Sequence, residues 1–365
     1  MKLLIQMGNK GNSIIDHLIT PITQVPFVDE IMLVSLKPGP NIKKVRYYNP
    51  PKTLRSNRVL AVIYEAVCLT ILSIFKNPSC IMGYLLVPHG LLAFVVAKLT
   101  KKPVGINFIA GPIELFSGGS PIGVDINKDL TTHGKLLSIL IKQANFFTTT
   151  GTITEQFLKN KGFNENKIYP IINPPNKHRF YNSKSSKKFD ILWLGRLAKV
   201  KCVETFLYSL VLVKKKLPNI TAIIVGDGPS RNQLETLSTK LGIDDIVTFL
   251  GYKENVEYYY NRAKVFVLTS EREGFPNVFL EAQMCGVPCI ISNCGDITDI
   301  AKHNVNSIII NNHKDYNAYA EAILKQLLNE SFYLSLKLNA YKDFKDLENN
   351  AKITWTKILS NFNVD

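Results

Sequence analysis

The stretch VFVLTSEREGFPNVFLEAQMCGVPCIIS, residues 265–292, holds one complete strand–loop–helix–strand unit. Its two ends are apolar runs of strand length, and the segment between them carries its own start and stop signals. Pro276 suits the first position of a helix, Gly286 suits the position just past its end, and Pro288 prevents the helix from continuing. The pattern therefore predicts a helix from Pro276 to about Cys285 between two buried parallel strands.

The same alternation extends outward through the rest of the chain. In the second half it predicts strands at 191–195, 222–226 and 247–251, each ending in glycine, and helices around 203–216, 230–241 and 255–262. In the first half it is weaker and predicts strands at 2–7, 31–35, 81–87, 104–109 and 146–149 and helices at 13–19, 59–75, 91–99 and 134–143. Apolar strands that alternate with helices are typical of parallel sheets covered on both faces. We expect an α/β protein with two Rossmann-like domains that face a cleft.

A length of 365 residues fits about two domains. The sequence Asn-Pro-Pro at 173–175 and the polar stretch 183–188 are typical of a linker. We therefore predict domains at 1–175 and 176–340, followed by a helical segment at 341–365. Its apolar pattern at 351–362 predicts a helix that returns to the first domain.

The net charge of +15 is unevenly distributed, because residues 1–180 hold 21 basic and 9 acidic residues and the remainder holds 23 and 20. Such an excess indicates an anionic partner, which is a nucleic acid, a lipid surface or a phosphorylated substrate. The six cysteines lack metal-ligand spacing and are interpreted as reduced core residues. The first seven residues read as a strand and not as a signal peptide. Together these features predict a cytoplasmic protein.

Two glutamates follow the strand at 265–270. We expect Glu273 in the loop and Glu281 inside the helix, both near the same ligand. Carboxylates accept hydrogen bonds from sugar and ribose hydroxyls, whereas free N–H groups at a helix start bind phosphate. These N–H groups belong to the stretch Gly274, Phe275, Pro276, Asn277 and Val278, apart from the proline.

Cations follow the strand at 191–195 in the sequence GRLAKVK. Arg196 offers a fork of donors and Lys201 a mobile point charge, which together suit a diphosphate. Such a pair can stabilise a leaving diphosphate without a metal. We therefore expect no metal cofactor.

Residues 165–330 resemble the donor-binding domain of GT-B glycosyltransferases of the family 4 type. The resemblance rests on the motifs ILWLGRLAKVK, AIIVGDGP and VTFLGY and on the E-x7-E spacing of Glu273 and Glu281. It implies retaining transfer of a sugar from a nucleoside-diphosphate sugar to a hydroxyl of a glycan or lipid-linked acceptor, in surface polysaccharide or glycolipid synthesis. The first domain would then bind the acceptor and the second the donor.

The resemblance also implies roles for single residues. Arg196 and Lys201 would hold the donor diphosphate, Glu281 the ribose hydroxyls, and Glu273 the donor sugar beside the reacting carbon. Tyr252 would lie by the base. Gly8 and Gly11 match the family's glycine-rich loop near the phosphates, although G-x2-G alone is also an ordinary turn.

The chain departs from the family pattern in three places. Lys201 is followed by Cys202 where the family has glycine, and Gly295, Asp296 and Asp299 stand where it has a glycine pair with glutamate. Ala110 occupies the position at which many members have an acceptor-side histidine. Either His89 takes that place, or it is a structural histidine at a strand end.

Seven basic residues and no acidic one lie between residues 36 and 64, next to the apolar stretch 59–75. A basic segment beside an amphipathic helix predicts reversible attachment to an anionic membrane, here the inner face of the cell membrane. Two alternatives use the same features: a sugar-nucleotide epimerase of GT-B-like fold, and a basic nucleic-acid-binding protein. The second lacks a zinc-finger, helix-turn-helix or RNP-like motif, so we expect no nucleic-acid partner.

Overall fold

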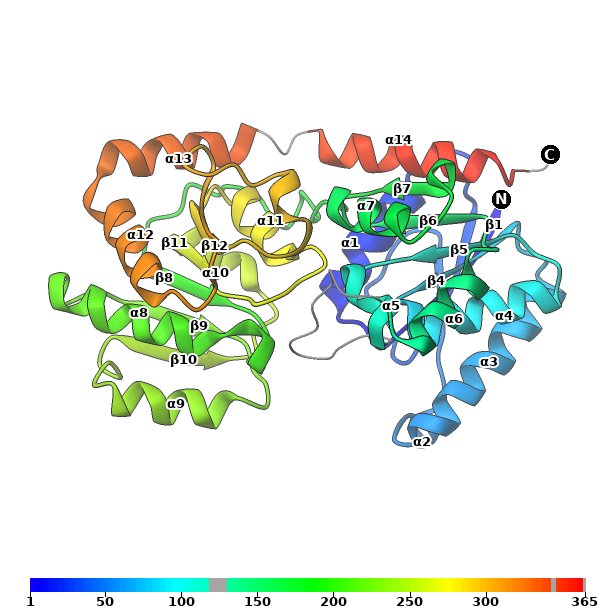
Figure 1. The fold of residues 1–365 in the computed structure, drawn as a ribbon, viewed down its shortest axis with the longest axis horizontal. Coiled ribbons are helices and arrows are strands. Elements are labelled where there is room, and N and C mark those ends of the chain that lie inside the picture. The colour runs from blue at the N-terminus through cyan, green and yellow to red at the C-terminus, as the bar shows by residue number, and fades with distance from the viewer. Residues whose placement is uncertain (118–129, 343–345, 364–365) are drawn as a thin grey trace. The chain divides into compact units, whose positions relative to one another are not determined.

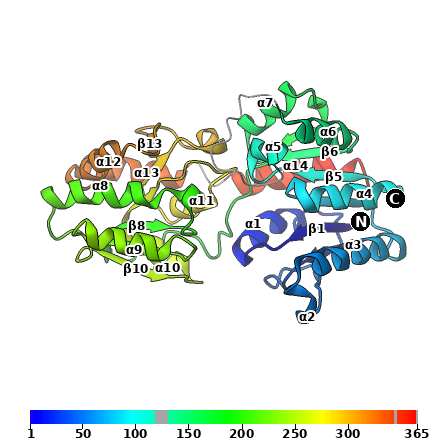
Figure 2. The ribbon, with the colours of Figure 1, turned by 60° about the horizontal axis from the view of Figure 1, so that its bottom comes forward.

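The chain folds into two units, each built on its own parallel sheet (Figures 1 and 2). The structure is a computed structural model that describes residues 1–117, 130–342 and 346–363. Unit 1 comprises Met1–Pro174 and Leu347–Asp365, and unit 2 comprises Pro175–Asp346. The last helix thus returns to the first unit.

Unit 1 has a seven-stranded parallel sheet of order β3-β2-β1-β4-β5-β6-β7. Its strands are β1 (Lys2–Gly8), β2 (Glu30–Ser35), β3 (Val45–Tyr48), β4 (Cys80–Tyr84), β5 (Val104–Asn107), β6 (Phe146–Thr149) and β7 (Ile168–Pro170). Its helices are α1 (Asn12–Thr23), α2 (Lys52–Arg55), α3 (Arg58–Phe75), α4 (Leu91–Leu99), α5 (Glu114–Ser117), α6 (Thr132–Ile141), α7 (Thr152–Asn160) and α14 (Leu347–Ser360).

Helices cover both faces of the unit 1 sheet because its strands alternate between two cores. In β1, Leu4 belongs to the core formed with α3, α4, α6 and α7, whereas Leu3 and Ile5 belong to the core formed with α1 and α14. The indole of Trp355 on α14 is 1% exposed and packs edge-on against Phe146 of β6. The C-terminal helix is therefore an integral layer of unit 1.

Unit 2 has a six-stranded parallel sheet of order β10-β9-β8-β11-β12-β13. One face packs on α8, α9 and α12, and on the other face Tyr260 of α10 packs against Phe266 of β11. The strands are β8 (Phe189–Leu194), β9 (Ala222–Val225), β10 (Val247–Gly251), β11 (Ala263–Leu268), β12 (Cys289–Ser292) and β13 (Ser307–Ile310). The helices are α8 (Val203–Lys216), α9 (Arg231–Lys240), α10 (Val256–Arg262), α11 (Asn277–Met284), α12 (Tyr316–Leu328) and α13 (Glu330–Lys342).

The predicted α/β class with two Rossmann-like domains is confirmed, but single helix ends differ from the pattern. Helix α11 begins at Asn277, because Pro276 adopts an extended conformation and is the N-cap. Helix α14 begins at Leu347, four residues before its predicted start at 351. Gly286 follows the end of α11 with a φ of 68°, as its position predicts.

Docking of α14 predicts a stability difference between two isoleucines on the same helix. Ile358 is fully buried and Ile353 is 56% exposed. We expect Ile358→Ala to lower the free energy of unfolding of unit 1 by about 2–5 kcal/mol, because it leaves a cavity. The matched control Ile353→Ala should change it by less than about 0.5 kcal/mol.

The two tryptophans allow each unit to be followed separately, since Trp355 lies in unit 1 and Trp193 in unit 2. Urea unfolding of protein labelled with 5-fluorotryptophan gives one ¹⁹F resonance for each unit. Equal midpoints of the Trp355 resonance for both variants would show that α14 does not stabilise unit 1.

Candidate active site

Both sheets place the first strand of the unit in their interior. β1 lies between β2 and β4, and β8 lies between β9 and β11. Connections that leave such a pair of strands run to opposite faces of the sheet, so a crevice opens at the carboxyl ends of the strands. The loops after β8 and β11 in unit 2, and after β1 and β4 in unit 1, are thus the places where a ligand is expected.

In unit 2 the loops after β8 and β11 are joined by an ion pair. The Lys201 ammonium contacts the Glu273 carboxylate, and Ser270 Oγ donates a hydrogen bond of 2.8 Å to the same carboxylate. The backbones are also tied, because Thr269 Oγ1 donates to the carbonyl of Lys201 at 2.8 Å. The attraction between these opposite charges holds the two side chains beside each other.

The loop that carries Glu273 rests on the segment after β12. The backbone N–H of Asp296 donates to the carbonyl of Gly274 at 2.9 Å. Gly295 has a φ of 59°, and a Cβ atom there would lie 2.3 Å from the same carbonyl oxygen. Only glycine fits this approach. Gly295 and Asp296, which depart from the family pattern, therefore contact the backbone of the loop that carries Glu273 and help to hold it in place.

Helix α11 contributes two features to the candidate site, the N–H groups of its first turn and the side chain of Glu281. Its N-cap is Pro276, which has no side chain to accept from the first N–H groups, so those of Asn277 and Val278 lack an intrahelical acceptor. Glu281 is 5% exposed and accepts a hydrogen bond of 2.9 Å from the hydroxyl of Tyr260. No sequence pattern pointed to Tyr260, since a tyrosine in a helix is usually a packing residue.

The remaining residues predicted in unit 2 lie on neighbouring turns. Arg196 is exposed in the turn after β8, and its turn is tied to the glycine-rich turn after β9 by the bond from Leu197 N–H to the carbonyl of Asp227, 3.0 Å long. Tyr252 follows β10 and is 72% exposed. Within the described residues, Arg196 forms no ion pair.

In unit 1 the loops after β1 and β4 lie in contact. Gly8 has a φ of 65°, and a Cβ atom on it would lie 2.0 Å from Nε2 of His89, so the imidazole packs directly on the glycine. Gly11 is the N-cap of α1. The glycine-rich loop thus holds His89, which follows β4, at the point where the strand order reverses.

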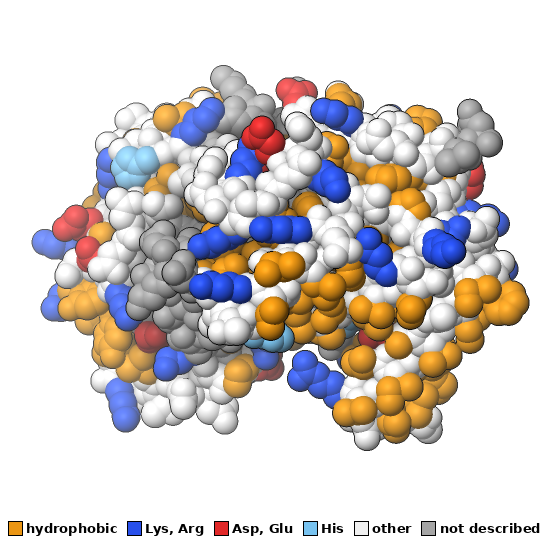
Figure 3. Space-filling model, turned by 45° about the vertical axis from the view of Figure 1, so that its right-hand side comes forward, with side chains coloured by type: hydrophobic (Ala, Val, Ile, Leu, Met, Phe, Trp, Pro, Cys, Tyr) orange, Lys and Arg blue, Asp and Glu red, His pale blue; other side chains and the backbone are white. Residues whose placement is uncertain are grey.

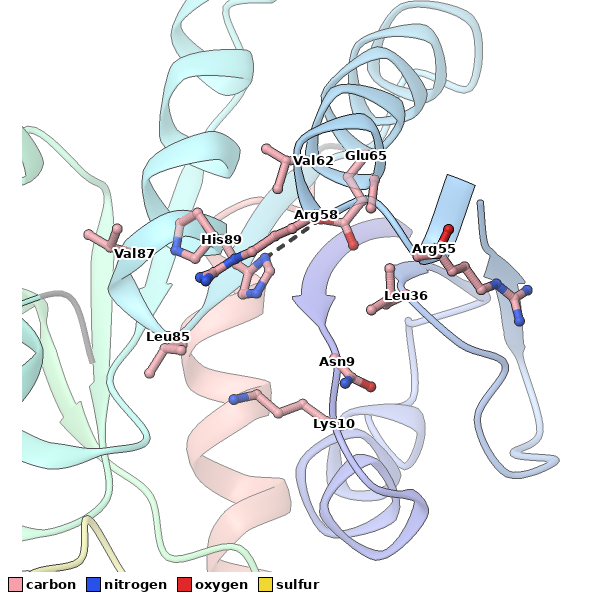
Figure 4. Close-up of a pocket in the computed structure, with 13 residues that line it drawn as sticks. Asn9, Lys10, Leu36, Arg55, Arg58, Val62, Glu65, Leu85, Val87 and His89 are labelled. Atoms are coloured by element: carbon pink, nitrogen blue, oxygen red, sulfur yellow. Dashed lines mark ion pairs between the residues drawn. The ribbon is translucent and has the colours of Figure 1, made fainter. Parts of the chain in front are cut away.

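A pocket of about 590 Å³ opens beside this contact. Figure 4 shows Lys10 reaching in from the loop after β1 and Arg58 extending from the start of α3 toward His89. Arg55 also lines the pocket, but its guanidinium points away from His89 (Figure 4). Apolar side chains form much of the remaining wall, among them Leu36, Ala61, Val62, Leu85 and Val87.

A buried polar network lies at the base of the pocket. The side-chain amide of Gln6 donates to Glu65 at 2.9 Å and lies 3.2 Å from Nδ1 of His89, and the Glu65 carboxyl is 3.8 Å from the same nitrogen (dashed line in Figure 4). Burial raises the pKa of Glu65 to about 7. Burial, together with the positive charges of Lys10 and Arg58, lowers the pKa of His89 to about 4. The histidine is therefore neutral at neutral pH.

Comparison with known proteins identifies unit 2. Residues 175–343 match the family of glycosyl transferases group 1. Unit 2 is a group 1 glycosyl transferase domain.

Individual relatives of the glycosyl transferase domain are moderately similar. An uncharacterized glycosyltransferase of Haemophilus influenzae is 27% identical over 213 residues, which cover 55% of this chain and 60% of that protein. An undecaprenol-linked-glycan α-1,4-N-acetyl-D-galactosaminyltransferase of Campylobacter jejuni is 34% identical over 49% of this chain and 50% of that protein. The chain thus spans about half the length of these curated relatives.

Among solved structures, HepE of Anabaena in complex with UDP-glucose superimposes with a TM-score of 0.75 at 17% identity, over 99% of this chain and 100% of that chain. At this identity the likeness establishes the fold alone. Together with the two parallel sheets, it shows that the whole chain has the GT-B arrangement of two Rossmann-like units.

The motifs predicted Arg196, Lys201, Glu273 and Glu281, which lie in the segments after β8 and β11, and their roles stay predictions. In unit 1 the sequence analysis singled out Gly8, Gly11 and His89, but not Gln6, Glu65 or Lys10. Glu114 was not singled out, yet it is buried and accepts from the N–H groups of Ile109 and Ala110 at 2.7 and 2.6 Å. The turn that carries Ala110 is therefore held by Glu114.

The network of Gln6, Glu65 and His89 predicts a specific pH dependence of unfolding. Folded Glu65 keeps its proton to about pH 7, whereas the unfolded chain loses it near 4.5, so its contribution to the free energy of unfolding falls as the pH rises across that window. His89 is neutral above about pH 4 when folded and above 6.5 when unfolded, so its contribution rises across that window. The two slopes oppose each other.

We therefore expect Glu65→Gln, which removes only the falling contribution, to make the stability of unit 1 rise more steeply between about pH 4.5 and 6.5 than in the wild type. Urea unfolding at a series of pH values, read from the ¹⁹F resonance of Trp355, measures this slope. Identical pH profiles for the two proteins would contradict the assignment.

Proposed function

We propose that the protein is a retaining glycosyltransferase that moves a sugar from a nucleoside-diphosphate sugar to a hydroxyl of a glycan or lipid-linked acceptor. The observation that carries this proposal is the contact between Lys201 and Glu273, at the carboxyl ends of β8 and β11 in a group 1 domain. HepE, of the same fold, is known in complex with UDP-glucose, which supports a nucleotide sugar as the donor.

The donor contacts follow from the chemistry of each group. Arg196 and Lys201 bind the diphosphate oxygens, and the free N–H groups of Asn277 and Val278 add uncharged donors at the positive end of α11. Glu281 accepts from the ribose hydroxyls, with Tyr260 holding its carboxylate in place. Tyr252, exposed after β10, stacks beside the base.

The transfer step needs charge stabilisation more than a strong base. The bond between the anomeric carbon and the phosphate oxygen breaks, and the acceptor oxygen bonds to the same face of that carbon. The acceptor proton passes to the leaving phosphate oxygen. Arg196 and Lys201 stabilise the negative charge that develops on the leaving diphosphate, so no metal ion is required. Glu273 accepts hydrogen bonds from the donor sugar and, through its contact with Lys201, positions that cation.

Substitution of the proposed donor contacts tests this assignment. Losing one charge-assisted contact costs about 1.5–3 kcal/mol, so Glu281→Gln and Arg196→Ala should each lower kcat/KM roughly tenfold or more. Glu281→Gln keeps an acceptor for the Tyr260 hydroxyl and so preserves the fold. The control Lys199→Ala removes an exposed cation from the same segment and should leave kcat/KM unchanged.

Transfer is measured as release of the nucleoside diphosphate from a panel of UDP- and GDP-sugars in the presence of lipid-linked and soluble glycans. Full activity of both Glu281→Gln and Arg196→Ala would remove these residues from the site. Conversion of the donor to an epimer without acceptor would instead identify an epimerase.

Attachment to an anionic membrane through α3 is the second part of the proposal. The residues Val59, Ile63, Val67, Ile71, Ile74 and Phe75 are 49% to 79% exposed and follow one another at helical spacing. We call them the α3 stripe. Figure 3 shows hydrophobic side chains gathered over the region of α3, with Lys and Arg side chains near them.

The charges beside the α3 stripe are all positive. Arg58 and Lys76 flank α3, and Lys98 lies on α4, which is tied to α3 by the bond from Ser73 Oγ to Thr100 Oγ1, 2.7 Å long. The one acid of the two helices, Glu65, is buried on the opposite side of α3 from the stripe. Each cation near an anionic leaflet contributes about 1 kcal/mol.

By length and composition α3 is the one helix in the described part of the chain that is long and apolar enough to cross a bilayer. Its other side carries Leu69 and Leu72, which pack in the core of unit 1, and Glu65, which is bonded to Gln6. Withdrawal of α3 into a bilayer would open that core and leave the network unpaired. We therefore propose that the helix lies along the membrane surface.

Flotation with vesicles tests the membrane contact. The wild type should float with vesicles of phosphatidylglycerol and phosphatidylcholine at low salt and less so at high salt, because surface charges are screened. Ile71→Asp should abolish flotation, since it places a negative charge in the α3 stripe. Ile353→Asp, at an exposed isoleucine of α14, is the matched control and should float as the wild type does. Equal flotation of all three proteins would exclude α3 as the contact.

A further inference from the structure

We propose that the pocket of unit 1 binds the phosphate ester of a lipid-linked acceptor, with Lys10 and Arg58 as its cationic contacts. The inference rests on the proposed glycosyl transfer and specifies the class of acceptor. It concerns the crevice of unit 1, whereas the donor contacts lie in unit 2.

Cations outnumber acids in the wall of the pocket, although outside the wall the buried Glu114 partly opposes the lowering of the Lys10 pKa. Lys10, Arg55 and Arg58 line the pocket, and within the described residues none of them forms an ion pair. Glu65 is the one acid in its wall, and its carboxyl is already bonded to Gln6. Burial of Lys10 lowers its pKa, which reflects the cost of keeping its charge partly away from water. A bound anion would offset that cost.

The two cations approach from different elements, which suits an anion with several oxygens. Lys10 comes from the loop after β1 and Arg58 from the first residue of α3 (Figure 4). An arginine fork and a lysine point charge on one ligand are typical of phosphate binding. The nearby helices α1 and α3 have no acidic residue in their first turns.

The pocket is larger and more apolar than a phosphate site alone requires. A volume of about 590 Å³ lies in the range of ligand pockets and exceeds that of one phosphate group. Val62 and Leu85 on its wall offer contacts to an apolar group next to the phosphate. The ligand that matches both features is an amphiphile whose phosphate and hydrocarbon are adjacent, as in a polyprenyl phosphate or diphosphate.

The position of the pocket on α3 agrees with a lipid source. Arg58, Ala61, Val62 and Glu65 line the pocket from the first half of the helix, and the α3 stripe begins at Val59 on its other side. A headgroup at the membrane surface on which the α3 stripe rests therefore lies close to the pocket. The neutral imidazole of His89 adds no charge there and leaves Lys10 and Arg58 to bind the anion.

Isothermal titration calorimetry tests the inference with three probes: farnesyl diphosphate, the uncharged alcohol farnesol, and inorganic pyrophosphate. Saturating UDP, or GDP where UDP does not bind, is present throughout, so that the diphosphate site proposed in unit 2 is occupied. We expect farnesyl diphosphate to bind at one site, farnesol not to bind, and pyrophosphate to bind at least tenfold more weakly than farnesyl diphosphate. Pyrophosphate binding as tight as that of farnesyl diphosphate would overturn the lipid assignment and indicate a soluble phosphate ester.

Variants locate the site. Lys10→Gln and Arg58→Gln should each weaken farnesyl diphosphate binding about tenfold or more, because each removes one charge-assisted contact. Lys10→Arg should retain most of the affinity. The control Lys43→Gln removes an exposed cation elsewhere in unit 1 and should bind as the wild type does. Unchanged affinity in both Gln variants, with unchanged melting temperatures, would overturn the proposal.

Different outcomes of this experiment would overturn the proposed pocket ligand in unit 1 and the proposed donor site in unit 2. UDP binding without any binding of farnesyl diphosphate would overturn the pocket assignment and leave glycosyl transfer standing. A failure of UDP and GDP to bind at all would overturn the donor site, whatever the pocket binds.

Discussion

The reversal of strand order beside β1 and β8 is the constraint on which the rest of the structure depends. A parallel sheet that grows outward from an interior strand sends neighbouring connections to opposite faces, so no helix covers the carboxyl ends at that point. In unit 2 this edge holds the contact between Lys201 and Glu273, and in unit 1 it holds the contact between Gly8 and His89. In both units the strand order therefore determines where the residues of the candidate site lie.

The two units use this edge differently, and the charge distribution reflects the difference. In unit 2, Lys201 contacts Glu273 and the buried Glu281 accepts a hydrogen bond from Tyr260, whereas Arg196 forms no ion pair among the described residues. Unit 1 leaves Lys10 and Arg58 without ion-pair partners among the described residues and surrounds them with apolar walls. The pocket and the border of the α3 stripe thus hold part of the excess positive charge of the first half of the chain.

The regular part of the fold could be predicted from the sequence because buried parallel strands are apolar throughout. The strand–loop–helix–strand prediction for residues 265–292 was correct apart from the start of α11, where Pro276 caps the helix instead of beginning it. The strands β3 and β7 lie at the edges of their sheet and carry mixed sequences such as VRYY, so they gave no apolar signal. Helices α12 and α13 were not predicted, although Asp315 caps the first turn of α12 and the Asn329 side chain accepts from the N–H of Phe332 at the start of α13.

The positions of Glu273 in a loop and of Glu281 inside a helix could be predicted because both follow a strand in a dense motif, and their roles stay predictions. The network in unit 1 was not predictable, because Gln6 and Glu65 are 59 residues apart in sequence and meet only when α3 packs on β1. The same packing brings Arg58 toward His89. Such a network arises from the tertiary fold, and no local spacing in the sequence predicts it.

Hydrogen–deuterium exchange with UDP and with GDP measures directly whether unit 2 binds a nucleoside diphosphate at the ends of β8 and β11. We expect slower exchange of the backbone N–H groups at 195–201 and 274–279, apart from Pro276, with at least one of the two nucleotides. Binding of either nucleotide without protection of these two segments, or with protection confined to unit 1, would contradict it.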